Sequence, residues 1–407
     1  MSTTIAIIDK ATLIPAHVKA EQVFAFDIYG DTRVTDDVQG SYAAALRGAP
    51  DIFWTPANGG HWMVQRTDLI EEIVKDYEVF SAREMQIPRV QDPPYMIPLN
   101  VDPPANLPYR AALMPKFSPR AVAAMEPRMR EWAVRLIEEV VDRGECDFIC
   151  DISSLFPVSV FLELMGLPLE KLREFRTLAD SFFTAHSNEE IGILGGQIMG
   201  VFSDLMDLRE NEPKDDLITH LLGVKIEGRP ITRDEILAMC FVLFLGGMDT
   251  VTNVTGFTYR RLAEDPELQA RLVCDPAIIP QFVEEGIRLH GVICTPRLCV
   301  KDDDRHGVSF RKGDMVLNVL SQGGRDVRIN PDADRFDIDR PEKRHLTFST
   351  GPHLCLGHIL ARAEMRILTE EWVKRIPSFR LRPGARHGFR IGTVHAIESL
   401  PIEWDVV

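Results

Sequence analysis

The stretch FSTGPHLCLG, residues 348–357, is the part of the sequence on which the interpretation of the whole chain depends. It is a loop interrupted by glycines, and an amphipathic segment with helical spacing begins directly after it, near His358. A cysteine just before a helix meets free backbone N–H groups and the positive end of the helix dipole, and both lower the pKa of a thiol. Cys355 is therefore expected to be a thiolate, which is the form that binds a metal ion.

Gly351 and Gly357 suit a loop that passes close to a flat group, because a side chain there would collide with it. Two other interpretations fit the loop alone. One is a buried, inert cysteine, and the other is a zinc site made of His353, Cys355 and His358. Zinc is the weaker of these, since structural zinc sites usually take four ligands and no second Cys/His cluster lies nearby in the sequence.

A second unusual stretch lies inside a long helix expected over residues 232–265. The helix opens with TRDE at 232–235, the Ser/Thr-x-x-Glu pattern of a capping box. Two poor helix formers, the glycines at 246–247, then interrupt an apolar run, at about 1 kcal/mol each relative to alanine. Asp249 and Thr250 follow directly. A tolerated kink, with these two side chains bonded to backbone carbonyls, explains the pattern as well as a function does.

A third pattern is the acid–arginine pair Glu285 and Arg288, followed later by NPDADRF at 330–336. Taken alone, the pair is better interpreted as a solvated surface pair, because such pairs are common and individually weak.

In their order and spacing, the three patterns resemble the cytochrome P-450 superfamily. Its haem-binding loop reads Phe-x-x-Gly-x-His/Arg-x-Cys-x-Gly, and residues 348–357 match every fixed position. The resemblance extends from about Val23 to Trp404 and is strongest to bacterial soluble camphor-hydroxylase-like members. It implies a mainly α fold with small β-sheets, a triangular helical prism that holds haem between the long central helix and the cysteine loop.

The resemblance also implies roles for individual residues around haem b, iron protoporphyrin IX. Cys355 would ligate the iron, with Phe348, Gly351 and Gly357 in its loop and Gly246 on the central helix beside the ring. Three cations, Arg110, Arg297 and His353, would clamp the two propionates. Glu285, Arg288 and Arg335 would form a buried structural network behind the loop.

Asp249 and Thr250 are the expected catalytic pair. Splitting the O–O bond of dioxygen consumes protons, which must be delivered into a dry pocket. Thr250 can hydrogen-bond dioxygen and Asp249 can relay protons from solvent by turning, while thiolate donation from Cys355 favours O–O cleavage.

The resemblance implies a small apolar substrate, a terpenoid or norisoprenoid similar to an ionone, linalool or camphor. A tyrosine loop at residues 92–98, one residue shorter than in the camphor hydroxylase, counts against camphor itself. The sequence leaves the exact substrate and the position of hydroxylation open. The expected pocket residues are Gln86, Tyr95, Met96, Val242, Leu245, Ile293, Thr295, Thr393 and Val394.

Electrons are expected from a separate protein, because the chain has no Gly-rich dinucleotide fingerprint. The resemblance points to a [2Fe–2S] ferredoxin with its NAD(P)H-dependent reductase. The acidic surface of the ferredoxin would meet a basic patch of Arg110, Lys343, Arg344 and Arg362. Two further functions stay open, a peroxide-driven haem-thiolate oxygenase and a non-catalytic haem carrier or sensor. Neither needs the acid–threonine pair.

Bulk properties limit the remaining possibilities. A net charge of −15 argues against nucleic-acid binding. Seven cysteines without a paired spacing predict no disulfides and a reducing compartment. The N-terminus shows no export signal, and the apolar run 236–248 is shorter than the roughly 20 residues of a bilayer span. We expect a soluble, cytoplasmic monomer.

Without repeats or linkers, residues 1–407 are expected to form one domain, with a β-rich region at about 45–70. There, strands around NGG at 58–60 predict a hairpin. Periodicity predicts helices over 121–143, 158–167, 217–222 and 361–376, and short strands at 297–300, 315–317 and 400–404.

Overall fold

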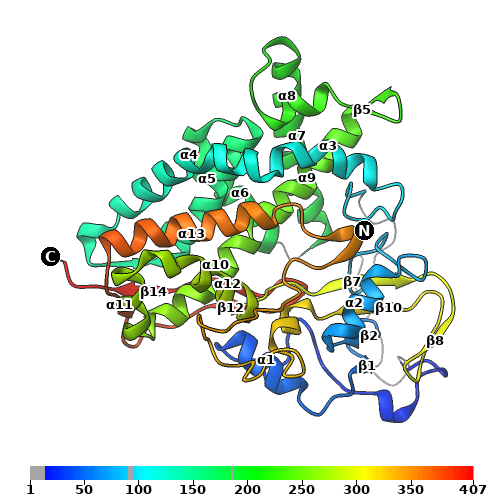
Figure 1. Cartoon of the computed structure of the whole chain (residues 1–407). Coiled ribbons are helices and arrows are strands. Elements are labelled where there is room, and N and C mark those ends of the chain that lie inside the picture. The colour runs from blue at the N-terminus through cyan, green and yellow to red at the C-terminus, as the bar shows by residue number, and fades with distance from the viewer. Residues whose placement is uncertain (1–13, 90–94, 185–186, 407) are drawn as a thin grey trace.

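The computed structural model describes residues 14–89, 95–184 and 187–406, and helices dominate it (Figure 1). The α-helices are α1 (Val38–Leu46), α2 (Thr67–Lys75), α3 (Leu107–Phe117), α4 (Pro119–Glu138), α5 (Leu155–Met165), α6 (Leu172–Thr184), α7 (Asn188–Asn211), α8 (Leu217–Leu222), α9 (Arg233–Met248), α10 (Thr250–Ala263), α11 (Pro266–Cys274), α12 (Ile279–Leu289) and α13 (His358–Arg375). The expected mainly helical fold is confirmed, and each predicted helix lies within a few residues of an observed one.

Strands β1, β2, β7, β8 and β10 lie at the lower right of Figure 1, whereas β5 lies beside α8 and β14 lies near the C-terminus. The largest sheet has the order β1-β2-β10-β7-β3 and consists of Ile52–Thr55, His61–Val64, Met315–Asn318, Thr295–Cys299 and Phe80–Ser81. A three-stranded sheet has the order β11-β14-β4, from Arg380–Leu381, Pro401–Glu403 and Glu145–Asp147. Three two-stranded ribbons complete the set: β12 (Phe389–Arg390) with β13 (Ala396–Ile397), β5 (Lys225–Ile226) with β6 (Arg229–Pro230), and β8 (Asp303–Arg305) with β9 (Val308–Phe310).

The predicted hairpin is confirmed. Strands β1 and β2 pair antiparallel, with Trp54 opposite Trp62. Between them Asn58, Gly59 and Gly60 have φ values of 54°, 87° and 80°, a left-handed run that asparagine and glycine tolerate best.

The long central helix is interrupted at one residue, Asp249, so the prediction of a continuous helix is wrong there. The capping box at the start is present, because the Thr232 side chain accepts from the Glu235 N–H and the Glu235 carboxylate accepts from the Thr232 N–H. At the break, the Thr250 hydroxyl donates to the Gly246 carbonyl over 2.8 Å. That carbonyl is the one that the Thr250 N–H would use in a regular helix, and such competition bends helices.

The cysteine loop leads into a helix that is held firmly in the core. Helix α13 lies beside α4 (Figure 1), and its Trp372 meets Phe148 edge-on, with ring centroids 5.1 Å apart. Phe148 in turn stacks on Tyr259 of α10 at 4.1 Å. Because α12 contacts both α10 and α13, the loop and the central helix are fixed relative to each other through one packed interior.

Two helices of the described residues, Glu189–Asn211 and Arg233–Ala263, are long and apolar enough to cross a membrane by composition alone. The second is the α9–α10 helix of the core, and core helices of soluble proteins pass the same test. All seven cysteines are free, as predicted.

Candidate active site

The cysteine loop folds back on itself before α13 begins. The Cys355 N–H donates to the Phe348 carbonyl over 2.9 Å, and the Phe348 ring lies under the Arg362 guanidinium at 4.6 Å from its centroid. Gly351 has φ +66°, and a Cβ there would lie 2.9 Å from the Lys75 side chain of α2. Gly351 is therefore needed for the fold of the loop against α2, which differs from the clearance under a flat group that the sequence suggested.

Although the Cys355 residue is partly exposed, desolvation of its thiol raises the pKa of that thiol in the protein alone, while a backbone hydrogen bond from Gly357 and the charges of Arg110 and Arg362 lower it. The expected lowering by the helix terminus is thus outweighed by desolvation. A coordinated metal ion reverses this balance, because it removes the proton from a thiol outright.

Two of the three predicted cations lie at the cysteine loop, since His353 belongs to it and the Arg110 guanidinium donates to the Leu354 carbonyl over 2.6 Å. Burial together with the charges of Arg297 and Arg110 lowers the pKa of His353 to about 3, so both arginines act on the histidine. Arg297 is itself buried on β7, and burial lowers its pKa to about 10. His353 Nε2 is buried without a hydrogen-bond partner among the described residues. A buried cation and an unpaired polar nitrogen call for an anion, so this donor set fits the carboxylates of haem.

The central helix has open space at the stretch that the resemblance places across the haem from the cysteine loop. A Cβ added at Gly246 would meet no atom within 4 Å, whereas one at Gly247 would lie 3.4 Å from the Phe161 ring. Val242 and Leu245 are half-buried residues of the same helix. Gly246 therefore borders open space, and its carbonyl is the one that the Thr250 hydroxyl bonds.

The Asp249 side chain is enclosed, since the residue is only 7% exposed. Burial raises the pKa of its carboxyl, against the lowering influence of Arg390, of a hydrogen bond with Asn253 and of Arg176. Arg390 Nη2 lies 4.0 Å from Asp249 Oδ2, and the Asn253 amide donates to the Asp249 carbonyl over 2.8 Å. Sequence reasoning missed both partners. The i, i+4 spacing from Asp249 could have indicated Asn253, whereas Arg390 follows 141 positions later without a local signal.

The expected pocket residues are distributed unevenly. The Cys294 N–H donates to the Thr393 carbonyl over 2.8 Å and Ile293 pairs with Val394, so two chain segments of the predicted pocket lie side by side. Thr295 and Met96 are buried. Gln86 is exposed and Tyr95 is 61% exposed, so the structure does not enclose these two residues. Residues 92–94 of the tyrosine loop lie outside the described residues.

The buried network behind the loop contains Glu285 and Arg288, both fully buried and joined by two hydrogen bonds of 2.7 and 2.8 Å. Its third member is Arg340, whose Nε lies 3.6 Å from Glu285 Oε1. The prediction of Arg335 as that member is wrong, because its side chain is exposed and only its carbonyl accepts from Arg288 and Arg340. Arg335 contributes its backbone carbonyl, which accepts from the guanidinium groups of Arg288 and Arg340.

The predicted basic patch lies along one groove of about 290 Å³, lined by Lys343, Arg344 and Arg362 together with Leu354. Arg110 joins it by donating to the Leu354 carbonyl over 2.6 Å. Arg362 is partly neutralised by two hydrogen bonds of 2.7 and 2.8 Å to Glu284, a carboxylate that the sequence analysis did not single out.

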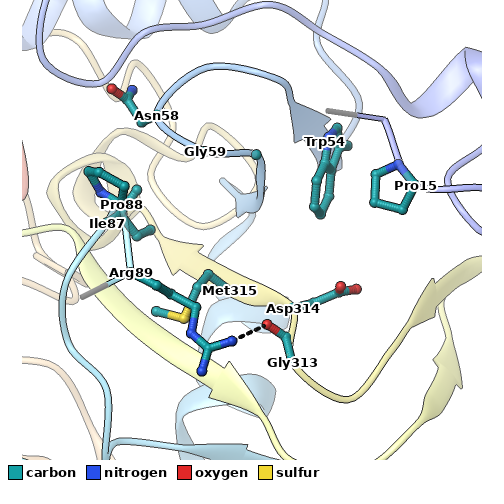
Figure 2. A pocket seen from close by; sticks show the side chains of 11 residues that line it. Pro15, Trp54, Asn58, Gly59, Ile87, Pro88, Arg89, Gly313, Asp314 and Met315 are labelled. Atoms are coloured by element: carbon teal, nitrogen blue, oxygen red, sulfur yellow. Dashed lines mark hydrogen bonds between the residues drawn. The ribbon is translucent and has the colours of Figure 1, made fainter. Parts of the chain in front are cut away.

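A second hollow, of about 350 Å³, lies elsewhere, at the β1–β2 turn (Figure 2). Trp54, Pro88 and Asp314 line it, and Arg89 donates to the Gly313 carbonyl across it over 3.3 Å. None of the predicted site residues lines this hollow, so it is separate from the candidate active site.

The fold and this site define a haem-thiolate oxidoreductase: a cysteine loop at a helix start, cations for two carboxylates, and an acid–threonine break in a long helix. The sequence profile described as Cytochrome P450 matches residues 198–275 and 277–383. A probable cytochrome P450 127A1 from Sinorhizobium fredii is 31% identical over 97% of this chain and 98% of its own.

The chain belongs to the cytochrome P450 family, and it is a monooxygenase with a haem-thiolate cofactor. The crystal structure of CYP101J2 superposes with a TM-score of 0.88 at 32% identity, covering 97% of this chain and 99% of that one. Linalool 8-monooxygenase from Pseudomonas putida is 26% identical over 92% of this chain and 98% of its own. The expected resemblance to camphor-hydroxylase-like members is confirmed.

Proposed function

We propose that the protein hydroxylates a small apolar terpenoid or norisoprenoid, similar to an ionone, linalool or camphor, with O₂ and electrons from a [2Fe–2S] ferredoxin. The observation that carries this proposal is the interrupted helix, where Thr250 and the buried Asp249 stand beside the open space at Gly246. Val242 and Leu245, half-buried apolar residues of the same helix, would make that space apolar, and a relative that is 26% identical over 92% of this chain is linalool 8-monooxygenase.

Cys355 would hold the haem iron, and Arg110, Arg297 and His353 would hold the propionates. When bound, haem supplies the redox chemistry that reduces O₂ and transfers one oxygen atom to the substrate.

The protein's own contribution is to move protons to the space beside Gly246 and Thr250. The raised pKa of Asp249 lets its carboxyl keep a proton at a higher pH than an ordinary aspartate does. By rotating about its side-chain bonds, this carboxyl can take a proton from water on one side and release it toward the Thr250 hydroxyl on the other. Thr250 now donates to the Gly246 carbonyl, and an acceptor placed at the open side would compete for that hydrogen.

The ferredoxin and its NAD(P)H-dependent reductase are proposed because the groove lined by Lys343, Arg344 and Arg362 forms a cationic surface on an otherwise acidic chain. The Cys355 loop lines the same groove through Phe348 and Leu354. A negatively charged electron donor bound there would be steered close to the cysteine. Arg344→Glu should weaken its binding, and unchanged turnover at low salt would contradict this docking surface. We further propose a soluble, cytoplasmic monomer.

The acid–threonine pair favours this function over a peroxide-driven oxygenase or a haem carrier, since neither needs protons delivered to O₂. Purified protein with ferredoxin, reductase and NADH should convert a member of a terpenoid panel to an alcohol. Consumption of substrate with hydrogen peroxide alone, but not with O₂ and NADH, would support the peroxide-driven alternative.

Thr250→Ala should keep consuming NADH while diverting electrons to hydrogen peroxide, so that product per NADH falls by about tenfold or more. Thr177→Ala is the control, because the Thr177 hydroxyl likewise bonds a carbonyl of its own helix, at 2.9 Å, on the surface of α6. Equal product per NADH in the wild type and Thr250→Ala would contradict the proton-delivery role.

A further inference from the structure

Asp249 has a charged partner that comes from the C-terminal β-ribbon. Arg390 belongs to β12, and its Nη2 lies 4.0 Å from Asp249 Oδ2. The arginine is 36% exposed whereas the aspartate is almost fully enclosed, so the guanidinium lies between the interior carboxylate and solvent.

The same guanidinium faces a second carboxylate at the surface. Arg390 Nε lies 3.6 Å from Glu398 Oε1, and Glu398 is about half exposed. Both separations exceed hydrogen-bond length, and Nε is buried without a hydrogen-bond partner among the described residues. Arg390 is therefore shared between two carboxylates and bound tightly to neither.

The ribbon also holds the backbone of the helix break. Ile397 of β13 donates its N–H to the Asn253 side-chain oxygen over 3.1 Å, and the Asn253 amide donates to the Asp249 carbonyl over 2.8 Å. Arg390 pairs with Ala396 across the ribbon. The turn between the strands carries Thr393 and Val394, the proposed substrate contacts, so one short ribbon touches both the pocket and the aspartate.

Among the charged groups near Asp249, Arg390 has the largest influence on the pKa of its carboxyl. On α6, Arg176 lowers and Asp180 raises the pKa of Asp249. These two form an ion pair with each other, with Arg176 Nε 3.0 Å from Asp180, so their influences largely cancel.

We propose that Arg390 is a positioning residue. Its guanidinium retains the Asp249 carboxylate on the solvent side of the helix break, and when the guanidinium moves to pair with Glu398 instead, the carboxylate is released to turn toward Thr250. This inference rests on the proposed role of Asp249 in proton delivery. Substrate that displaces Thr393 or Val394 would shift the ribbon, and so couple occupation of the pocket to the release of the carboxylate.

The first test compares product per NADH and the solvent deuterium isotope effect in Arg390→Gln and Arg390→Lys. Arg390→Gln should change product per NADH by about 2- to 5-fold, the range of a partly exposed ion pair, and should alter the isotope effect. Arg390→Lys should restore most of the wild-type behaviour because it keeps the charge. Arg382→Gln is the matched control, since Arg382 makes a comparable surface ion pair with Glu145 at 3.3 Å.

The second test follows the Asp249 carboxyl itself by carbon-13 NMR of aspartate-labelled, haem-loaded protein as the diamagnetic ferrous–CO complex. The signal that Asp249→Asn removes identifies the residue. It should titrate at higher pH in Arg390→Gln than in the wild type, and at lower pH in Glu398→Gln, where the arginine has one competitor fewer. An Asp249 titration that neither substitution moves would overturn the inference.

Failure of the inference can be told from failure of the proposed function. If Asp249→Asn leaves product per NADH unchanged, the proton-delivery proposal itself is wrong. If Asp249→Asn uncouples turnover while Arg390→Gln matches the wild type in both tests, proton delivery holds and only the role of Arg390 is refuted.

Discussion

Replacing Arg340 by glutamine tests the correction to the buried network behind the cysteine loop. Its side chain is 8% exposed and donates to the carbonyls of Pro331, Asp332 and Arg335. Charged hydrogen bonds contribute about 1.5–3 kcal/mol each, and a glutamine amide can replace only part of them. The fully buried Glu285 carboxylate also loses a cation at 3.6 Å. We expect a loss of about 2–4 kcal/mol in the free energy of unfolding.

Arg335→Gln is the matched control, because it changes the same residue type only five positions away. Its side chain is exposed, so the expected change is within about 0.5 kcal/mol. Urea unfolding followed by circular dichroism, at equal haem saturation, measures both variants. The assignment is refuted if Arg335→Gln is at least as destabilising as Arg340→Gln.

Two further predictions concern the space at the helix break and the response to acid. Gly246→Val should leave stability almost unchanged, because its Cβ meets open space, but it should weaken the spectral shift on substrate binding. Gly256→Ala should unfold at a lower temperature, because its Cβ would lie 2.5 Å from Ile149. A lower melting temperature for Gly246→Val than for Gly256→Ala would contradict this. Burial lowers the pKa of His395 to about 4 from an ordinary 6.5, so the unfolded chain takes up this proton first and stability falls as pH drops from about 6.5 to 4, by about 1.4 kcal/mol per pH unit. His395→Gln should lessen the slope of the urea-unfolding free energy by this amount, while the share from His61, whose pKa burial also lowers to about 4, remains. An unchanged slope would count against a neutral, buried His395 imidazole.

Local signals were sufficient for much of the fold. The NGG turn predicted the β1–β2 hairpin, the capping box at 232–235 predicted the start of α9, and periodicity located α8 and α13. In each case the residues that determine the element are neighbours in the chain. A kink at Asp249 and Thr250 was one of the open alternatives, and the Thr250 hydroxyl bonds a backbone carbonyl as that alternative supposed. Periodicity could not decide between a kink and a continuous helix, because a hydroxyl that bonds the i−4 carbonyl leaves hydrophobic periodicity unchanged.

The sequence predicted those parts of the candidate site whose residues lie together in one short motif. The loop around Cys355 and the pair Glu285–Arg288 occur as compact patterns, and Glu285 and Arg288 form the buried pair that the resemblance implied. The third member of the network lies in an irregular, Pro-rich segment without periodicity, so identifying it as Arg340 and not Arg335 required coordinates. Arg390 reaches Asp249 only through the tertiary arrangement of the β12–β13 ribbon.

The absorption spectrum of the purified protein, ferric and then reduced under CO, tests the central claim most directly. Ligation of haem iron by the Cys355 thiolate predicts a strongly red-shifted ferrous–CO Soret band, lost in Cys355→His. Addition of the correct terpenoid to the ferric protein should convert it from low to high spin by displacing water. A colourless protein, or a ferrous–CO band without the red shift, would contradict the account.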